Sequence, residues 1–174
     1  MSDKESTFSW IKSNLITIFY AVLIALAIRT FLFQPFFIPS SSMEPGLLVG
    51  DRIFASKYDY GYSRHSFPLS LPIIKGRLFE SSPKRGDVVI FKPPHTKNDY
   101  IKRLIGLPGD KIKVVEGIVH INSIPIKTKF VRNNNQGISI YKETLPSGVS
   151  YEIKDLGEKP QDNIDEFLVP ENHY

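Results

Sequence analysis

A short run of serines is the first place where the chain could carry chemistry. The segment Ile38–Gly46 reads IPSSSMEPG and places three serines between two prolines. A serine hydroxyl is a weak nucleophile until a base removes its proton, so the segment gains catalytic meaning only beside a suitable partner. Without one, serines between prolines are typical of a polar turn.

A lysine in an apolar setting is the partner that the sequence offers. The segment Asp99–Ile112 reads DYIKRLIGLPGDKI, and a strand over Tyr100–Ile105 would place Lys102 on one face with Tyr100 and Leu104. Loss of water favours the neutral amine of a lysine, which can act as a general base. Most lysines are solvated surface groups, so the segment alone leaves both interpretations open.

The composition excludes several other chemistries. The chain has no cysteine, which rules out disulfides, thiolate metal ligands and cysteine nucleophiles. Its histidines lack metal-ligand spacing, so we expect no metal and no cofactor; they are His65, His95, His120 and His173. The formal net charge of +4 is spread along the chain without interleaved aromatic residues, and nucleic acid is not an expected partner. A membrane lipid surface suits a mildly basic protein with an apolar segment better.

The element that precedes the serines is strongly apolar. Leu15–Ile28 reads LITIFYAVLIALAI, and extending it to Phe33 gives nineteen residues, or about 28 Å of helix, enough for one membrane span. The sequence predicts an anchor helix that ends at Pro35. Ala25-Leu26-Ala27 leaves open a cleaved secretory signal, and a buried core helix is the other alternative.

The remainder predicts a β-rich domain. Five segments have the composition of strands; they are Asp51–Ser56, Asp87–Phe91, Tyr100–Ile105, Lys111–Val115 and Ile118–Ile121. The last two flank Glu116-Gly117, a spacing that suits a two-residue hairpin. Phe67–Arg85 is a proline-containing insertion without clear periodicity.

The chain resembles bacterial type I signal peptidases over nearly its whole length. The stretches that carry the resemblance are FLFQPFFIPSSSMEPGLLVGD, YDYGYSRHSFP, PKRGDVVIFK, DYIKRLIGLPGD and FLVPENHY. They match, in the right order, the family's serine motif P-S-x-S-M-x-P-T-L and its lysine motif D-Y-I-K-R-x-x-G-x-P-G-D. Gly46 stands where the family usually has threonine.

The resemblance implies a serine–lysine protease. Ser42, directly before the methionine, is similar to the family's nucleophile, Lys102 to its general base, and Ser40 to its oxyanion-hole hydroxyl. The implied function is cleavage of signal peptides from exported precursor proteins, with signal peptides and membrane lipid as partners and no cofactor. The oligomeric state stays open.

The implied fold is mainly β, with one N-terminal transmembrane helix and a single β-rich catalytic domain. We expect a polar cytoplasmic segment at 1–13, an anchor helix at 14–34 and an extracytoplasmic peptidase domain at 35–174, in the cytoplasmic (inner) membrane. Charge alone does not indicate the orientation, because lysine or arginine residues flank both ends of the span.

The family's last motif, of the type G-D-N-R-D-N-S, has no counterpart before Tyr174. We therefore expect a domain incomplete at its C-terminal end, with little or no peptidase activity in the 174-residue chain as it stands. An inactive family member or a non-catalytic, membrane-anchored binding domain is the alternative. A self-cleaving serine–lysine repressor fits less well, because the chain starts with an apolar span and not a helix-turn-helix.

Overall fold

The computed structural model describes residues 2–63, 66–67, 76–94, 96 and 98–174. One long helix is followed by short strands, so the mainly β class with an N-terminal apolar helix is confirmed. The chain divides into two compact units. The first joins residues 2–36 to residues 53–82, and the second joins residues 37–52 to residues 83–174.

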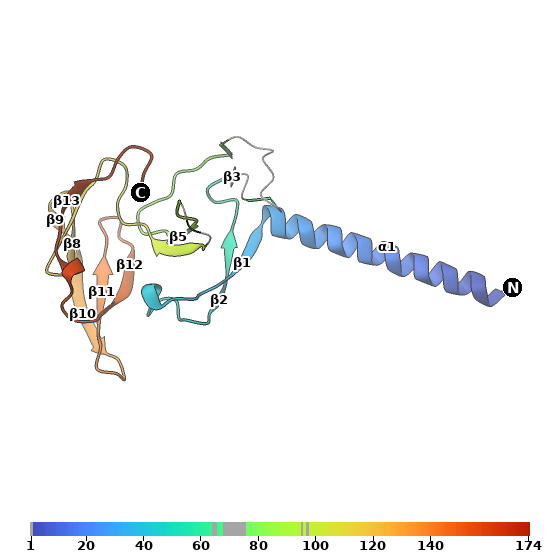
Figure 1. The fold of residues 1–174 in the computed structure, drawn as a ribbon, viewed down its shortest axis with the longest axis horizontal. Coiled ribbons are helices and arrows are strands. Elements are labelled where there is room, and N and C mark those ends of the chain that lie inside the picture. The colour runs from blue at the N-terminus through green and yellow to red at the C-terminus, as the bar shows by residue number, and fades with distance from the viewer. Residues whose placement is uncertain (1, 64–65, 68–75, 95, 97) are drawn as a thin grey trace. The chain divides into compact units, whose positions relative to one another are not determined.

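The first unit consists of the helix and two small sheets. Figure 1 shows α1, Ser2–Phe31, as one uninterrupted helix. Within it, Trp10–Phe31 contains an 18-residue window with a mean hydropathy of 2.0, and no residue of that window is buried in the protein. At 1.5 Å per residue this stretch is about 33 Å long, which matches the apolar thickness of a bilayer. The helix therefore has the length and composition of a membrane-spanning segment.

The helix ends earlier than the sequence predicts. It stops at Phe31, before the predicted end of the anchor at residue 34, and strand β1, Phe33–Phe37, already contains Pro35. The physical reason is pairing with a strand further along the chain. β1 pairs with β2, Arg52–Ser56, and the Lys57 amide donates to the Leu32 carbonyl at 2.9 Å. A proline fits there because a strand with a single neighbour has one side without ladder bonds.

The insertion predicted between Phe67 and Arg85 is only partly visible. Strand β4, Arg77–Leu78, lies within it and pairs antiparallel with β3, Tyr62–Ser63, which precedes it. Residues 68–75 lie outside the described part of the chain, as do His65 and His95.

The second unit is built from three antiparallel sheets. β5, Val88–Phe91, pairs with β6, Tyr100–Arg103. A four-stranded sheet has the order β13-β7-β8-β9, with bounds Ile164–Leu168, Lys111–Val115, Ile118–Ile121 and Ile124–Pro125. A three-stranded sheet has the order β10-β11-β12, with bounds Lys127–Asn133, Ser139–Thr144 and Ser150–Asp155. A 3-10 turn, Pro160–Asp162, precedes β13.

The predicted hairpin is confirmed residue for residue. β7 and β8 have the predicted bounds, and Glu116 and Gly117 both adopt positive φ, at 50° and 76°. Two consecutive residues with positive φ are the geometry of a type I′ turn, whose twist suits a hairpin. β6 is shorter than expected, because it ends at Arg103 and not at Ile105.

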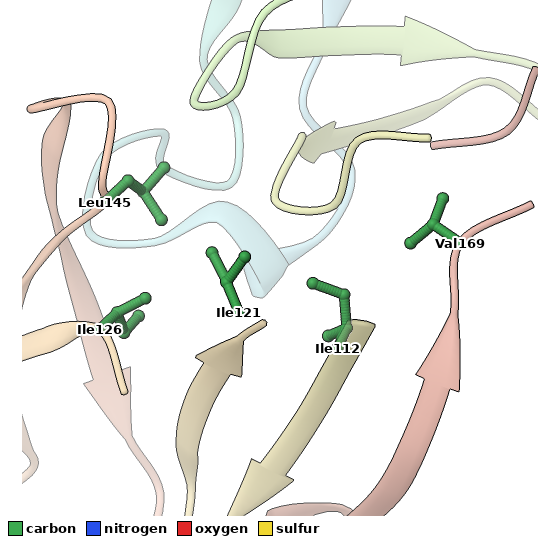
Figure 2. Packing of buried hydrophobic residues seen from close by; sticks show 5 residues of the cluster. All are labelled: Ile112, Ile121, Ile126, Leu145 and Val169. Atoms are coloured by element: carbon green, nitrogen blue, oxygen red, sulfur yellow. The ribbon is translucent and has the colours of Figure 1, made fainter. Parts of the chain in front are cut away.

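The core of the second unit joins two of its sheets. Figure 2 shows five buried aliphatic side chains that lie in or next to the ends of strands; they are Ile112, Ile121, Ile126, Leu145 and Val169. None is more than 8% exposed. Ile126 and Leu145 flank the three-stranded sheet and the other three belong to the four-stranded sheet or follow it. Their packing stabilises the frame on which the candidate site is built.

Candidate active site

The serine segment forms a loop that is closed at its base. Ile38 is 2% exposed, its amide donates to the Asp51 carbonyl at 3.0 Å, and its carbonyl accepts from Gly50 at 3.0 Å. The Asp51 carboxylate also accepts a hydrogen bond from the Leu48 amide at 2.8 Å. These contacts anchor both ends of the loop and leave its tip free to present side chains.

The tip is a 3-10 turn, η1, which spans Ser41–Met43. The Glu44 amide closes the turn on the Ser41 carbonyl at 3.1 Å. None of the turn's side chains is buried, and Ser42 is exposed. A nucleophile needs such accessibility, because a substrate carbonyl has to approach its oxygen.

The structure brings Ser42 and Lys102 together across sixty positions of sequence. Lys102 Nζ donates a hydrogen bond to Ser42 Oγ. Lys102 lies half-buried on β6, opposite Val89 of β5. Of its predicted apolar neighbours on that face, Leu104 is buried and Tyr100 is 43% exposed. A neutral Lys102 amine would accept the Ser42 hydroxyl proton along the same line, which is the geometry required of a general base.

Ser40 lies beside the same oxygen. Its Oγ is 3.3 Å from Ser42 Oγ, and either hydroxyl can be the donor. Ser40 precedes η1 in extended conformation and is exposed, so its hydroxyl can also turn toward a bound ligand. All three site residues predicted from the sequence therefore lie in one place.

A cleft of about 440 Å³ adjoins the serine and the lysine. Three segments line it: Ser42–Gly46, the end of β6 with Ile105, and Tyr151–Ile153 of β12. The third segment was not predicted from the sequence. It lies about fifty positions beyond Lys102 and contains no motif that would mark it as part of a site.

A buried polar cluster supports the residue next to Lys102. Arg103 donates to the Gly86 carbonyl at 2.8 Å, and its guanidinium lies 4.2 Å from the centre of the Tyr151 ring. Glu143 is 5% exposed, and burial raises the pKa of its carboxyl, although Tyr151 and Arg103 partly oppose the shift. Burial and the neighbouring Glu143 in turn raise the pKa of the Tyr151 hydroxyl. This cluster fixes β6 and β12 on either side of the cleft.

The loop after β6 is held by Asp110. This carboxylate is 6% exposed and accepts hydrogen bonds from the Leu107 amide, from Asn122 and from Arg85, at 2.7, 2.9 and 2.8 Å. Burial alone would raise the pKa of Asp110, but these three donors outweigh it and lower that pKa. The G-x-P-G-D end of the lysine motif thus has a structural role in ordering the chain behind Lys102.

The histidines make only local contacts where the structure describes them. His120 Nδ1 lies 3.0 Å from the Ile118 carbonyl, and His173 Nδ1 lies 2.9 Å from the Glu171 carbonyl. In the described part of the chain, no three His, Asp or Glu side chains gather as metal ligands would.

The comparisons with known proteins give one family over most of the chain. A family model described as signal peptidase, peptidase S26, matches residues 8–174. Signal peptidase I of Rickettsia massiliae is 39% identical over 185 aligned positions, which cover 98% of this chain and 70% of that protein. Signal peptidase I of Rickettsia felis is 41% identical over 169 positions, covering 89% and 64%, and that of Rickettsia bellii is 40% identical over 167, covering 88% and 58%.

The chain belongs to the signal peptidase family, peptidase family S26. This family match confirms the class of enzyme expected from the sequence, a hydrolase of the serine-protease type. The chain spans between 58 and 70% of the length of these three relatives.

Proposed function

We propose that the protein is a membrane-bound serine endopeptidase that removes N-terminal signal peptides from exported precursor proteins. The observation that carries this proposal is the hydrogen bond between Lys102 Nζ and Ser42 Oγ at the edge of an open cleft. Exposure alone is ordinary for a serine or a lysine, but a nucleophile and its base need mutual contact and access to substrate together, and Ser42 and Lys102 have both.

In the proposed mechanism, the neutral Lys102 amine takes the hydroxyl proton of Ser42 as Oγ attacks the carbonyl carbon of the scissile peptide bond. The lysine ammonium then gives that proton to the leaving amine, and an acyl-enzyme remains on Ser42. Lys102 next takes a proton from water, whose oxygen attacks the ester and releases the acid and the free serine. These steps use only groups of the protein and water.

The negative oxygen of each tetrahedral intermediate needs donors. The Ser40 hydroxyl and the Ser42 backbone amide are the proposed pair, since Ser40 Oγ lies beside the nucleophile. One such donor typically lowers the barrier by about 3–4 kcal/mol. The substrate is proposed to bind as an added β-strand, with small residues at the first and third positions before the cleaved bond in shallow depressions.

The helix supplies the proposed location. Residues 14–34 would anchor the protein in the cytoplasmic (inner) membrane, with residues 1–13 in the cytoplasm and residues 35–174 on the extracytoplasmic side. The exposed apolar surface of Trp10–Phe31 supports an anchor, because an apolar helix of this length satisfies its own backbone hydrogen bonds and is stable in lipid. Anchoring would bring the site to a substrate whose own signal segment lies in the bilayer.

The proposal is tested by processing of a precursor protein with a membrane-reconstituted version of the protein that carries the family's last motif after Tyr174. Ser42→Ala and Lys102→Ala are each expected to lower the rate by at least about 1000-fold. Ser41→Ala is the matched control, since Ser41 is an exposed neighbour in the same turn with no proposed role. Sequencing of the product identifies the cleaved bond. Equal losses in all three variants would contradict the dyad, and binding of the precursor without any cleavage would favour a non-catalytic binding domain.

A further inference from the structure

An ion pair joins the serine loop to the far wall of the cleft. Lys154 Nζ donates a hydrogen bond to Glu44 Oε2, across 110 positions of sequence. The two side chains are 18% and 20% exposed. Two other pairs of the same unit are more open to water: Lys111–Glu166, at 59% and 39%, and Arg132–Glu152, at 52% and 34%. The Glu44–Lys154 pair is therefore screened less than either of them.

The pair is placed where it can control the nucleophile. Glu44 directly follows η1 and lies two residues after Ser42. Lys154 is on β12, next to the Tyr151–Ile153 segment that lines the cleft. The bond thus connects the turn that carries the nucleophile to a strand of a packed sheet.

The carboxylate is also bound on its own side of the loop. The hydrogen bond from Lys154 is the main reason that the pKa of Glu44 is lowered; burial opposes it, and a backbone hydrogen bond from Val49 adds a smaller lowering. Glu44 is accordingly charged at neutral pH, and its contacts connect the tip of the loop to Val49, near the end of the loop, and to Lys154 of β12.

The turn has few other means of staying in place. None of its three residues is buried, so no side chain packs it into the core. The Lys102 contact is itself the reacting contact, and it changes as the proton moves. A displacement of about 1 Å between nucleophile and base can lower a rate about 100-fold.

We propose that the Glu44–Lys154 ion pair is a positioning device that holds Ser42 at the Lys102 amine. This inference rests on the proposed function, in which Ser42 attacks and Lys102 accepts its proton. Glu44 and Lys154 act through the loop and do not touch the reacting atoms.

The test compares kcat and KM for precursor cleavage by the version that carries the family's last motif, here called the unchanged protein, and by its Glu44→Gln variant. We expect kcat to fall about 10- to 100-fold with KM nearly unchanged, since Ser42 moves relative to the Lys102 amine while the cleft keeps its shape. The double variant Glu44→Lys, Lys154→Glu restores an ion pair and is expected to recover part of kcat. Glu166→Gln removes the carboxylate of the exposed pair between β7 and β13 and is expected to leave both constants unchanged.

Amide hydrogen exchange of residues 41–47 provides a readout that does not require activity. Exchange there is expected to be faster in Glu44→Gln than in the unchanged protein or Glu166→Gln. An unchanged kcat in Glu44→Gln overturns the inference, and so does unchanged exchange of the loop. If the unchanged protein cleaves no precursor, the proposed function fails instead, and the exchange comparison alone decides whether the pair holds the loop.

Discussion

At the scale of single residues, the site is defined by three side chains that two distant segments supply. Ser40 and Ser42 come from a loop whose base is tied by Ile38, and Lys102 comes from a strand. The polar residues behind Lys102 are not part of the proposed chemistry. Among them, Glu143 is the most informative, because it is a buried acid beside a partly buried tyrosine, Tyr151.

The charge state of Glu143 gives a prediction about stability. Its pKa is raised in the folded protein, so the proton is bound more tightly there than in the unfolded chain. The stability that this proton confers is complete at acid pH and is lost as the pH rises through the folded-state pKa. Glutamine resembles the protonated acid at every pH. Glu143→Gln is therefore expected to be more stable than the unchanged protein at pH 7, with the two converging below about pH 4.

Thermal unfolding in detergent from pH 4 to pH 8 measures this difference. Glu152→Gln is the matched control on the neighbouring strand, because a bidentate pair with Arg132 lowers the pKa of Glu152. The pKa of Glu152 is shifted in the opposite direction to that of Glu143, so Glu152→Gln is expected to be less stable than the unchanged protein at neutral pH. A Glu143→Gln protein that unfolds at a lower temperature than the unchanged protein at pH 7 would contradict the assignment.

At the scale of elements, the site depends on the turn that joins the lysine strand to the core. Gly106 follows β6, and a Cβ atom added there would lie 2.9 Å from Val169 Cγ2 and 3.3 Å from Ile112 Cγ1. Both neighbours belong to the core cluster of Figure 2. Close packing leaves little room for them to move. Gly106→Ala is expected to destabilise the protein by about 1–3 kcal/mol.

Gly46 provides the control for that substitution. A Cβ atom there would meet only the Met43 carbonyl oxygen, at an ordinary 3.5 Å. Gly46→Ala is therefore expected to unfold close to the unchanged protein, and the threonine usual in the family fits the same space at its Cβ. Equal unfolding temperatures for the two alanine variants would show that the Val169 side chain moves to make room for the added methyl group. The packing argument would then be wrong.

Local signals in the sequence predict the elements that depend on local chemistry. The β7–β8 hairpin follows from Glu116-Gly117, and the apolar run Leu15–Ile28 lies within α1. The sequence predicts the end of α1 too late, because the hydrogen bond between Leu32 and Lys57 joins residues that are distant in sequence. The β12 wall and the Glu44–Lys154 pair have no local signal for the same reason. Ser40, Ser42 and Lys102 were found through motif resemblance, and their proximity through the fold.

At the scale of the whole molecule, the helix is the element on which the proposed membrane location rests. Trp10–Phe31 exposes its apolar side chains on every side, and a soluble environment would leave that surface in contact with water. We expect the protein to sediment with membranes and to stay there after carbonate extraction.

Mass spectrometry of the recovered protein separates an anchor from a cleaved signal. An anchor predicts retention of the segment from Trp10 to Phe31 in the membrane fraction. A soluble product that starts near Arg29 would identify Ala25-Leu26-Ala27 as a cleavage site and would contradict the anchor.

The central claim, that the amine of Lys102 is the base for Ser42, has a direct chemical test in this chain. Because the protein contains no cysteine, Lys102→Cys would carry the only thiol. Alkylation with 2-bromoethylamine then rebuilds an amine on a side chain of lysine-like length at that single position, while iodoacetamide caps the thiol without an amine. The measurement is the rate of precursor cleavage before and after each treatment, in the version that carries the family's last motif.

The account predicts that Lys102→Cys is inactive, that aminoethylation restores cleavage, and that the iodoacetamide product stays inactive. It also predicts that the restored rate rises with pH, as the new ammonium loses its proton. Cleavage by untreated Lys102→Cys at the rate of the unchanged protein, or no recovery in fully aminoethylated and folded protein, would contradict the claim that this amine activates Ser42.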